Sequence, residues 1–216
     1  MVGAHIAVLV SGGGTNLQAL LDAFNGSGSP HRVVLTVSNR KDAYGLVRAQ
    51  EAGVEARYIG KGNFPDSAER SKELLKALQE AKADWVVLAG YLDILSPEIV
   101  ETYNRRILNI HPSLIPAFCG MGFHGIHVHE AALARGVKFS GATVHFVDSG
   151  ADTGPILLQE VVTVEQGDTP DLLQKRILPV EYRLLVQAVT AAADGRIVWS
   201  DDKPSIQDLD TGLRFA

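Results

Sequence analysis

The sequence predicts an α/β protein with a doubly wound, mostly parallel sheet, mixed at one edge, that carries helices on both faces. Short apolar runs typical of buried strands alternate with segments whose apolar residues recur at helical spacing. Two later apolar runs follow each other with only a loop between them, which predicts an antiparallel hairpin. Strands and helices in this order are typical of a Rossmann-like architecture.

The first half of the chain supplies the parallel part of the expected sheet. Its expected strands cover residues 5–10, 32–37, 54–59, 85–89 and 107–111. Its expected helices cover residues 17–24, 44–52, 66–84 and 96–103. Gly53 is a stop signal for the second helix, and Ser96 followed by Pro97 is a good start for the fourth.

The pattern changes after His111. Residues 112–125 contain prolines and glycines and are expected to form a long, functional loop. The elements expected after it are a helix at 127–134, strands at 142–147 and 156–164, a long helix at 170–193 and a short strand at 196–199. We expect Pro179 to kink the long helix. At 216 residues the chain suits one domain, expected at 1–199, with residues 200–216 as a polar, loosely ordered tail.

Composition and charge argue against several classes of function. The apolar content of 46% and the charged content of 21% are ordinary for a soluble globular protein. A net charge of −5 without a basic cluster argues against a nucleic-acid partner. No apolar run approaches the ~20 residues that cross a bilayer, and the N-terminus lacks the basic flank of a secretion signal, so we expect a cytoplasmic protein without a membrane partner. A single cysteine excludes intrachain disulfides and cysteine-based zinc sites.

The apolar run Ile107–His111 is the expected centre of the functional site. Asn109 and His111 are two residues apart on one strand, so both side chains project to the same face at its carboxyl end. Ligands bind at that edge of an open parallel sheet. An imidazole beside an amide can polarise a carbonyl and stabilise an oxyanion. Taken alone, an Asn-x-His motif is more often a turn cap and a buried core histidine, so the assignment depends on the rest of the chain.

A glycine-rich connection, Ser11–Asn16, joins the first strand to the first helix. Its amides and the helix dipole suit a phosphate. The dinucleotide fingerprint is incomplete, because Leu17 stands where a third glycine is needed and the second strand ends in Asn39 rather than an acid. No lysine stands where a nucleoside-triphosphate loop needs one. A single phosphate on a small substrate is therefore favoured, although a tight turn alone would also explain the glycines.

Either of two aspartates could complete the site. Asp148 and Asp152 lie in the loop that joins the two strands of the expected hairpin. A carboxylate near His111 would raise the pKa of the imidazole and favour its charged form, which an oxyanion stabiliser requires. A solvated turn aspartate is the alternative for each. The residues alone do not choose between Asp148 and Asp152.

Four stretches of the chain resemble the folate-dependent formyltransferase family, and within it the phosphoribosylglycinamide formyltransferases of purine biosynthesis. They are residues 11–17, 88–97, 108–116 and 145–155, and the resemblance runs from about residue 5 to residue 199. The motifs Asn-x-His-Pro-Ser-x-x-Pro and Asp-x-Gly-Pro are specific to the wider family, and the glycine loop narrows the resemblance. It implies the formyltransferase variant of the Rossmann-like fold.

The resemblance also implies an activity and a set of site residues. The enzyme would transfer the formyl group of 10-formyltetrahydrofolate, its co-substrate, to the amine of glycinamide ribonucleotide, without a metal. Asn109, His111 and Asp152 would be catalytic. The substrate would be bound by Gly14, Thr15, Asn16 and Glu181. The formyl donor would contact Leu92, Asp93, Ile94, Leu95, Asn109, Asp148, Ser149, Gly150, Ala151 and Asp152, with Arg70 as a further candidate.

Other functions stay open beside this one. A formyltetrahydrofolate deformylase, or another formyltransferase, would use the same chemistry on a different acceptor. A non-catalytic phosphate-binding protein would use only the glycine loop. His127 and His129 have a metal-like spacing but lack a third ligand in the sequence, so we expect no metal, and with His124 they are expected beside the phosphate. The sequence leaves open whether the protein forms a homodimer.

Overall fold

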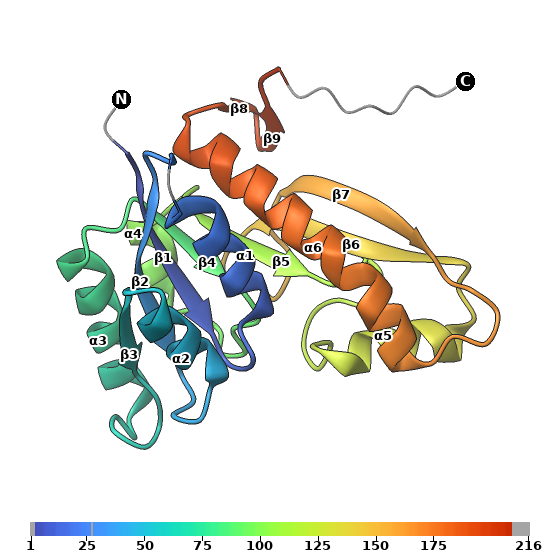
Figure 1. Cartoon of the computed structure of the whole chain (residues 1–216), viewed down its shortest axis with the longest axis horizontal. Helices are drawn as coiled ribbons and strands as arrows, with labels where there is room; N and C mark the ends of the chain where they lie inside the picture. Colours follow the sequence, from blue (N-terminus) through green and yellow to red (C-terminus); the bar gives the residue numbers. More distant parts are fainter. Residues whose placement is uncertain (1–2, 27, 209–216) are drawn as a thin grey trace.

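A seven-stranded sheet forms the centre of the protein. The computed structural model describes residues 3–26 and 28–208, and Figure 1 shows the sheet between its helices. In spatial order the strands are β3 (Glu55–Tyr58), β2 (Arg32–Ser38), β1 (His5–Val10), β4 (Trp85–Leu88), β5 (Ile107–His111), β6 (Phe139–Phe146) and β7 (Ile156–Thr163). Neighbours from β3 to β5 pair in parallel, whereas β5–β6 and β6–β7 are antiparallel. The predicted mixed sheet is confirmed.

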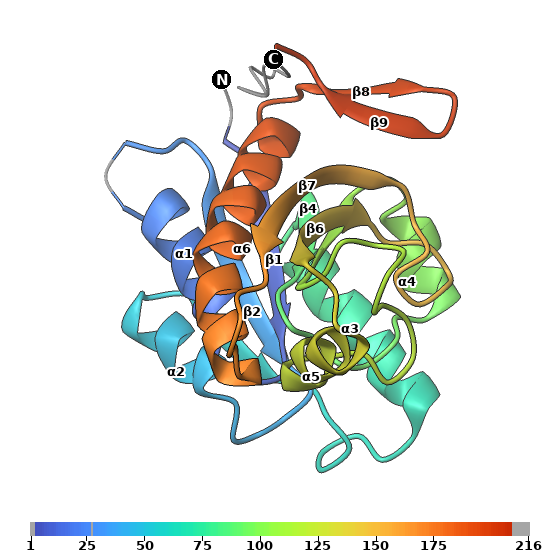
Figure 2. The ribbon, with the colours of Figure 1, turned by 90° about the vertical axis from the view of Figure 1, so that its right-hand side faces the viewer.

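Six helices cover the two faces of this sheet within the described residues. They are α1 (Thr15–Phe24), α2 (Tyr44–Glu51), α3 (Ser67–Glu80), α4 (Pro97–Thr102), α5 (Ile126–Arg135) and α6 (Pro170–Ala193). One core cluster joins the sheet to α1 and α6 through residues such as Leu20 and Ile177. A second joins the opposite face to α3 and α4 through Leu78 and Ile99. Figure 2 shows the sheet between these two layers, so the predicted doubly wound arrangement is confirmed.

Local signals explain where several helices begin. The Asp66 side chain accepts hydrogen bonds from the amides of Ala68 and Glu69, both at 2.9 Å, and so caps α3. The Thr169 side chain caps α6 by accepting a hydrogen bond from the amide of Leu172. Pro170 lies in the first turn of α6, where a backbone amide would have no partner within the helix. Helix α6 continues through Pro179, where we expected a kink. None of the helices in the described ranges is long and apolar enough to span a membrane.

A C-terminal hairpin packs beyond the sheet. Strands β8 (Ile197–Ser200) and β9 (Lys203–Ile206) pair antiparallel, and the Trp199 ring lies 4.7 Å from the Phe146 ring. Strand β9 falls within the segment expected to be a loose polar tail, so that expectation is wrong for residues 203–206. Residues 209–216 of that segment lie outside the described residues.

The strand order places one edge of the sheet where ligands are expected. The chain moves outward from β1 to β3 and then crosses to β4 on the other side of β1, so the winding direction reverses between β1 and β4. The loops after these strands are tied together, because Ser11 N donates to Gly90 O at 3.0 Å and Leu92 N to Ser11 Oγ at 2.9 Å. The glycine loop therefore adjoins the segment that follows β4.

Candidate active site

Strand β5 brings the first two predicted site residues to this edge. Asn109 pairs in register with Leu88 of β4 and with His145 of β6. His111, at the end of the strand, is only 4% exposed, and Asn109 is half-buried. Because the strand is held on both sides, the direction in which these two side chains project is fixed by the sheet.

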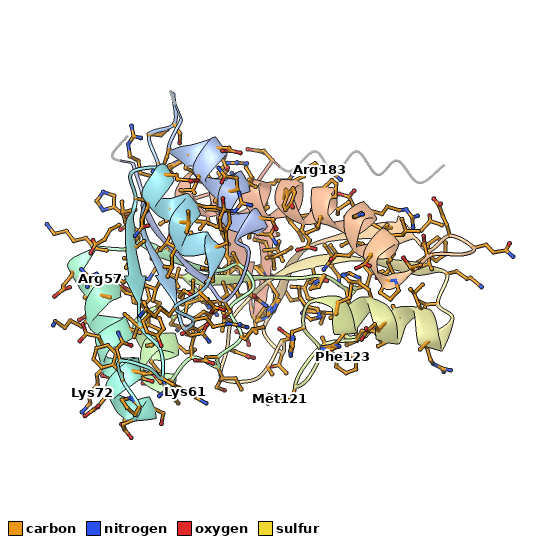
Figure 3. All side chains as sticks on the ribbon, turned by 60° about the horizontal axis from the view of Figure 1, so that its bottom comes forward. Arg57, Lys61, Lys72, Met121, Phe123 and Arg183 are labelled. Carbon is orange, nitrogen blue, oxygen red and sulfur yellow. The ribbon has the colours of Figure 1, made fainter. Side chains whose placement is uncertain are left out.

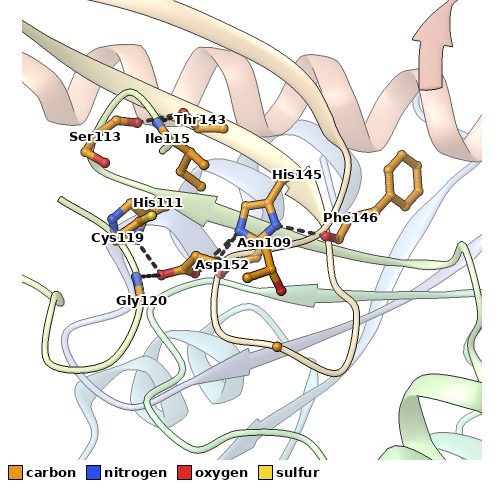
Figure 4. A network of polar contacts seen from close by, with 12 residues as sticks. Asn109, His111, Ser113, Ile115, Cys119, Gly120, Thr143, His145, Phe146 and Asp152 are labelled. Carbon is orange, nitrogen blue, oxygen red and sulfur yellow. Dashed lines mark hydrogen bonds and ion pairs between the residues drawn. The ribbon is translucent and has the colours of Figure 1, made fainter. Parts of the chain in front are cut away.

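Asp152 reaches the same point from the loop that joins β6 to β7. One carboxylate oxygen, Oδ2, lies 3.6 Å from His111 Nδ1 and accepts a hydrogen bond from the amide of Gly120 at 2.9 Å. The other, Oδ1, accepts from Asn109 Nδ2 at 3.2 Å. Figure 4 shows Asp152 at the centre of this network. The structure thus brings Asn109, His111 and Asp152 into contact.

Asp148 has a different position from Asp152, although the two are four residues apart. Its Oδ1 accepts hydrogen bonds from Gly150 N at 3.0 Å and from Thr153 Oγ1 at 2.7 Å. These bonds close the turn of the loop. The choice that the sequence left open is therefore decided by geometry: Asp152 contacts the histidine, and Asp148 shapes the loop.

His145 is a further member of the network that sequence reasoning missed. Its Nδ1 lies 2.8 Å from Phe146 O, and a carbonyl can only accept, so Nδ1 carries the proton. Its Nε2 is 3.0 Å from Asn109 Nδ2 and 3.5 Å from Asp152 Oδ1. Nε2 therefore faces both the amide of Asn109 and the carboxylate of Asp152. The signal that could have revealed it is the register between β5 and β6, which the sequence does not give.

Burial and charge act in opposite directions on the central pair. Burial lowers the pKa of His111 below its ordinary value, and the Phe118 carbonyl and the Asp152 charge only partly oppose this. Burial by itself would raise the pKa of Asp152, but the contact with His145, the Gly120 amide and the charge of His111 together hold it below its usual value. The site therefore holds an ionised carboxylate beside an imidazole whose proton is easily lost.

The loop 112–125 forms one wall of the site, as its length suggested. His111 Nε2 lies 2.8 Å from Phe118 O, and the Gly120 amide binds Asp152, so the loop contacts both members of the central pair. Farther along, Met121 and Phe123 lie at the edge of the molecule in Figure 3, and Met121 is 78% exposed. The outer part of the loop is thus open to solvent, whereas its base is bonded to the site.

A cavity of about 360 Å³ opens beside the network. Its lining includes most of the predicted donor contacts: Leu92, Asp93, Ile94, Leu95, Asn109, Asp148, Gly150, Ala151 and Asp152. Ser149 and Arg70 are the two exceptions, and Ser149 lines another cavity, next to Trp199. Arg70 lines an adjoining cavity of about 400 Å³ that shares the segment 91–95, and its Nη1 donates to Phe64 O and Pro65 O. The cavity falls within the range usual for small-molecule sites.

The glycine loop and Glu181 form a second polar region. Gly14 precedes α1 in a left-handed conformation (φ +69°). Thr15 is the first residue of the helix and is exposed to solvent. Asn16 Nδ2 donates to Glu181 Oε2 at 2.8 Å, which joins α1 to α6 inside the protein. Burial raises the pKa of Glu181 to about 7, despite the bond from Asn16. All four predicted substrate contacts therefore lie around the start of α1.

His124, His127 and His129 differ in burial, although the rings of His124 and His127 lie 5.3 Å apart. His124 lines the cavity, and His127 is exposed and paired with Glu130 at 2.9 Å. His129 is fully buried, neither ring nitrogen has a hydrogen-bond partner, and burial lowers its pKa to about 4. The expectation that all three line one side of the site is wrong for His129. Within the described ranges, no group of three or more His, Cys, Asp or Glu could hold a metal ion.

Comparisons with known proteins agree on one family. A family model described as formyl transferase matches residues 4–189. A chloroplastic phosphoribosylglycinamide formyltransferase from Arabidopsis thaliana is 42% identical over 205 residues, which cover 94% of this chain and 70% of that protein. A phosphoribosylglycinamide formyltransferase from Escherichia coli K12 is 38% identical over 193 residues, 89% of each chain. The solved structure of glycinamide ribonucleotide transformylase 1 from Symbiobacterium toebii matches with a TM-score of 0.88 and 43% identity, covering 95% of both chains.

Proposed function

The chain belongs to the formyl transferase family, and from that premise we propose how its site works. The protein is an enzyme that transfers a formyl group to the amine of glycinamide ribonucleotide, a step of purine biosynthesis. The formyl donor is 10-formyltetrahydrofolate. The observation that carries this proposal is the contact of His111, Asn109 and Asp152 beside a cavity of suitable size.

The formyl donor occupies the cavity beside β5. The segment Leu92–Leu95 and the loop residues Asp148, Gly150, Ala151 and Asp152 form parts of its wall. Tyr91 and Leu95 belong to the same wall, so a flat heterocycle meets apolar as well as polar groups there. The anionic end of the donor extends toward the adjoining cavity, where Lys61 and Arg70 are the basic lining residues.

The acceptor binds with its phosphate at the glycine loop. The amides of Gly14, Thr15 and Asn16 lie at the positive end of α1, which favours an anion. Glu181 is buried and bonded to Asn16, and we assign it to accept hydrogen bonds from hydroxyl groups of the same substrate. Ser11 bonds the amide of Leu92, which lines the donor cavity, so an acceptor with its phosphate at this loop can extend its amine toward that cavity.

The reaction is a direct acyl transfer. The amine attacks the formyl carbon, a nitrogen–carbon bond forms, and the carbonyl oxygen becomes an oxyanion. Protonated His111 stabilises this oxyanion, and Asp152 stabilises the charge on His111 from 3.6 Å. The bond from the formyl carbon to the folate nitrogen then breaks, and the proton lost by the amine passes to that nitrogen. In the free enzyme His111 Nε2 is bonded to Phe118 O, so this bond must exchange for one to the substrate.

Asn109 has a more restricted part in this scheme. Its Nδ2 already donates to Asp152 Oδ1 and lies 3.0 Å from His145 Nε2, so this amide is engaged in the free enzyme. Asn109 can donate to the oxyanion only when one of these contacts is released. His111 is therefore the principal oxyanion donor, and Asn109 assists it.

The experiment that tests the proposal measures folate consumption with and without the acceptor. Purified protein should consume 10-formyltetrahydrofolate only when glycinamide ribonucleotide is present, with one formylated product per folate consumed. Folate loss without the amine would instead make the protein a deformylase. Phosphate binding without any formyl transfer would make it a non-catalytic phosphate-binding protein.

A further inference from the structure

Helix α2 holds two carbonyl groups of the glycine loop. Gly12 O accepts a hydrogen bond from Gly45 N at 3.0 Å, and Gly13 O accepts one from Arg48 Nε at 2.8 Å. In a planar trans peptide the carbonyl and the following amide point in opposite directions. The amides of Gly13 and Gly14 are therefore turned away from α2.

Arg48 is held firmly enough to fix this orientation. Its Nη1 donates to Gln18 Oε1 at 3.0 Å, and its guanidinium carbon lies 5.0 Å from the centre of the Tyr44 ring. The side chain is half-buried. Because the guanidinium is planar, the bonds from Nε and Nη1 constrain each other. Gly13 O is thus bound by a charged donor that cannot easily turn.

The loop and α2 also meet closely at two glycines. A Cβ on Gly14 would lie 2.7 Å from the Cα of Gly45, and a Cβ on Gly45 would lie 2.8 Å from Val10. Only glycine at both positions allows the backbone of α2 to reach Gly12 O. Arg48 is brought to the loop by this same contact, one helical turn after Gly45.

The peptide that Arg48 holds adjoins unpaired donors of α1. The first amides of a helix have no partner within it, and Gly14 caps α1 without a side-chain hydrogen bond. Gly13 and Thr15 are exposed, so an anion can approach from solvent. The amides of Gly13 and Gly14 therefore point away from α2, and the positive charge of Arg48 lies on the α2 side of the same loop.

We propose that Arg48 is a positioning residue for the phosphate of the substrate. It holds the Gly13–Gly14 peptide with its amide toward the phosphate, and its charge strengthens the positive field at the start of α1. This inference rests on the proposed function, because that function places the phosphate at this loop. Arg48 itself is bonded to the loop and is not expected to touch the reacting atoms.

The test compares Arg48→Lys with Arg48→Gln. Lysine keeps the charge but lacks the planar fork whose Nε and Nη1 bond Gly13 O and Gln18 Oε1, whereas glutamine removes the charge as well. Arg48→Lys should raise the KM for glycinamide ribonucleotide about tenfold, roughly 1.4 kcal/mol of binding, and Arg48→Gln should raise it further. The kcat and the KM for 10-formyltetrahydrofolate should change less than about twofold. Arg40→Lys is the matched control, since the Arg40 side chain is exposed and, among the residues that the structure describes, pairs only with Asp42.

A binding measurement separates this inference from the proposed function. The affinity for inorganic phosphate, measured by titration calorimetry, should fall in Arg48→Lys by a factor similar to that of the KM. If the wild-type protein binds phosphate more tightly than Arg48→Lys does but transfers no formyl group, the proposed function fails and the role of Arg48 stands. If Arg48→Lys keeps both the wild-type KM and the wild-type phosphate affinity, the role of Arg48 is wrong. Equal losses for both substrates with a lower melting temperature would also overturn it, since they indicate a general structural role.

Discussion

Replacing Asp152 by asparagine tests the centre of the proposed mechanism. Asparagine keeps the size of the side chain, and it tolerates the left-handed backbone conformation of Asp152 (φ +58°) as well as aspartate does. It removes the negative charge that lies 3.6 Å from His111 Nδ1. The substitution therefore changes the electrostatics of the pair while leaving the path of the loop intact.

The size of the effect follows from this distance and the burial of the two groups. Two unit charges about 4 Å apart interact by about 1 kcal/mol in bulk water and about 4 kcal/mol at an effective dielectric constant of about 20. The side chains are 6% and 16% exposed, so the upper part of this range applies. We expect Asp152→Asn to remove about 2–4 kcal/mol of transition-state stabilisation, a fall in kcat/KM of about 30- to 1000-fold.

The pH dependence gives the sign of the effect. Burial lowers the pKa of His111, and Asp152 is one of the groups that oppose this, so its removal lowers the pKa further. The proposed active form is protonated, and activity should therefore fall off at a lower pH in Asp152→Asn than in wild type. Steady-state kcat/KM measured across pH 5 to 9 would follow this change.

The matched control is Asp148→Asn. Asp148 lies in the same loop, and the carbonyl of asparagine can accept the same bonds from Gly150 N and Thr153 Oγ1. This variant should keep kcat/KM within about threefold of wild type, since it leaves the charge beside His111 in place. If the two variants lost activity equally, or if Asp152→Asn kept the wild-type pH profile, the electrostatic role of Asp152 would be wrong.

Three further substitutions test other parts of the site. His111→Ala should remove about 2–4 kcal/mol of transition-state stabilisation, measured as a lower kcat, while the affinity for phosphate is kept. A kcat near that of wild type would contradict the proposed role. The wild-type protein should lose about 3 kcal/mol of stability as the pH rises from 4.5 to about 7, because the buried Glu181 carboxyl must then ionise, and Glu181→Gln should abolish this loss. Urea unfolding at pH 5 and pH 8 measures the loss, and the same pH dependence in the variant as in wild type would refute the prediction. His129→Leu should stabilise the protein at pH 4.5 by about 2 kcal/mol relative to wild type. Between pH 6.5 and about 4, this histidine binds a proton in the unfolded wild-type chain but stays neutral in the folded one, which favours unfolding. Acid unfolding curves that coincide for the two proteins would refute this.

The fold was predictable because local patterns and topology agree along most of the chain. Apolar runs of strand length alternate with helical periodicity, and this alternation leaves few arrangements other than a parallel sheet covered on both faces. The C-terminal hairpin was harder to predict. Strand β9 contains Lys203 and Pro204, which are poor strand formers, and it is held by its pairing with β8 and by the burial of Ile206. Tertiary contact overrides local preference there.

Part of the site was predictable for a similar reason, and part was not. Asn109 and His111 follow from the period of a single strand. His145 joins them only because β6 pairs with β5 in a register that sets it opposite Asn109. Arg48 joins the glycine loop only because two glycines let α2 approach it. Such partners depend on how elements pair in space, and a sequence pattern within one element carries no information about that.

The choice of Asp152 over Asp148 depends on a close approach of two backbone segments. A Cβ on Gly154 would lie 1.9 Å from Phe146 O, so the end of the loop is pressed against the end of β6. The amide of Phe146 donates to Pro155 O at 2.9 Å, which holds the returning chain in that place. Asp152 lies just before this contact, and its left-handed backbone conformation turns the side chain toward β5. The Gly-Pro that follows Asp152 and Thr153 thus fixes the carboxylate beside His111, which gives the Asp-x-Gly-Pro motif a physical meaning: its glycine and proline position its aspartate.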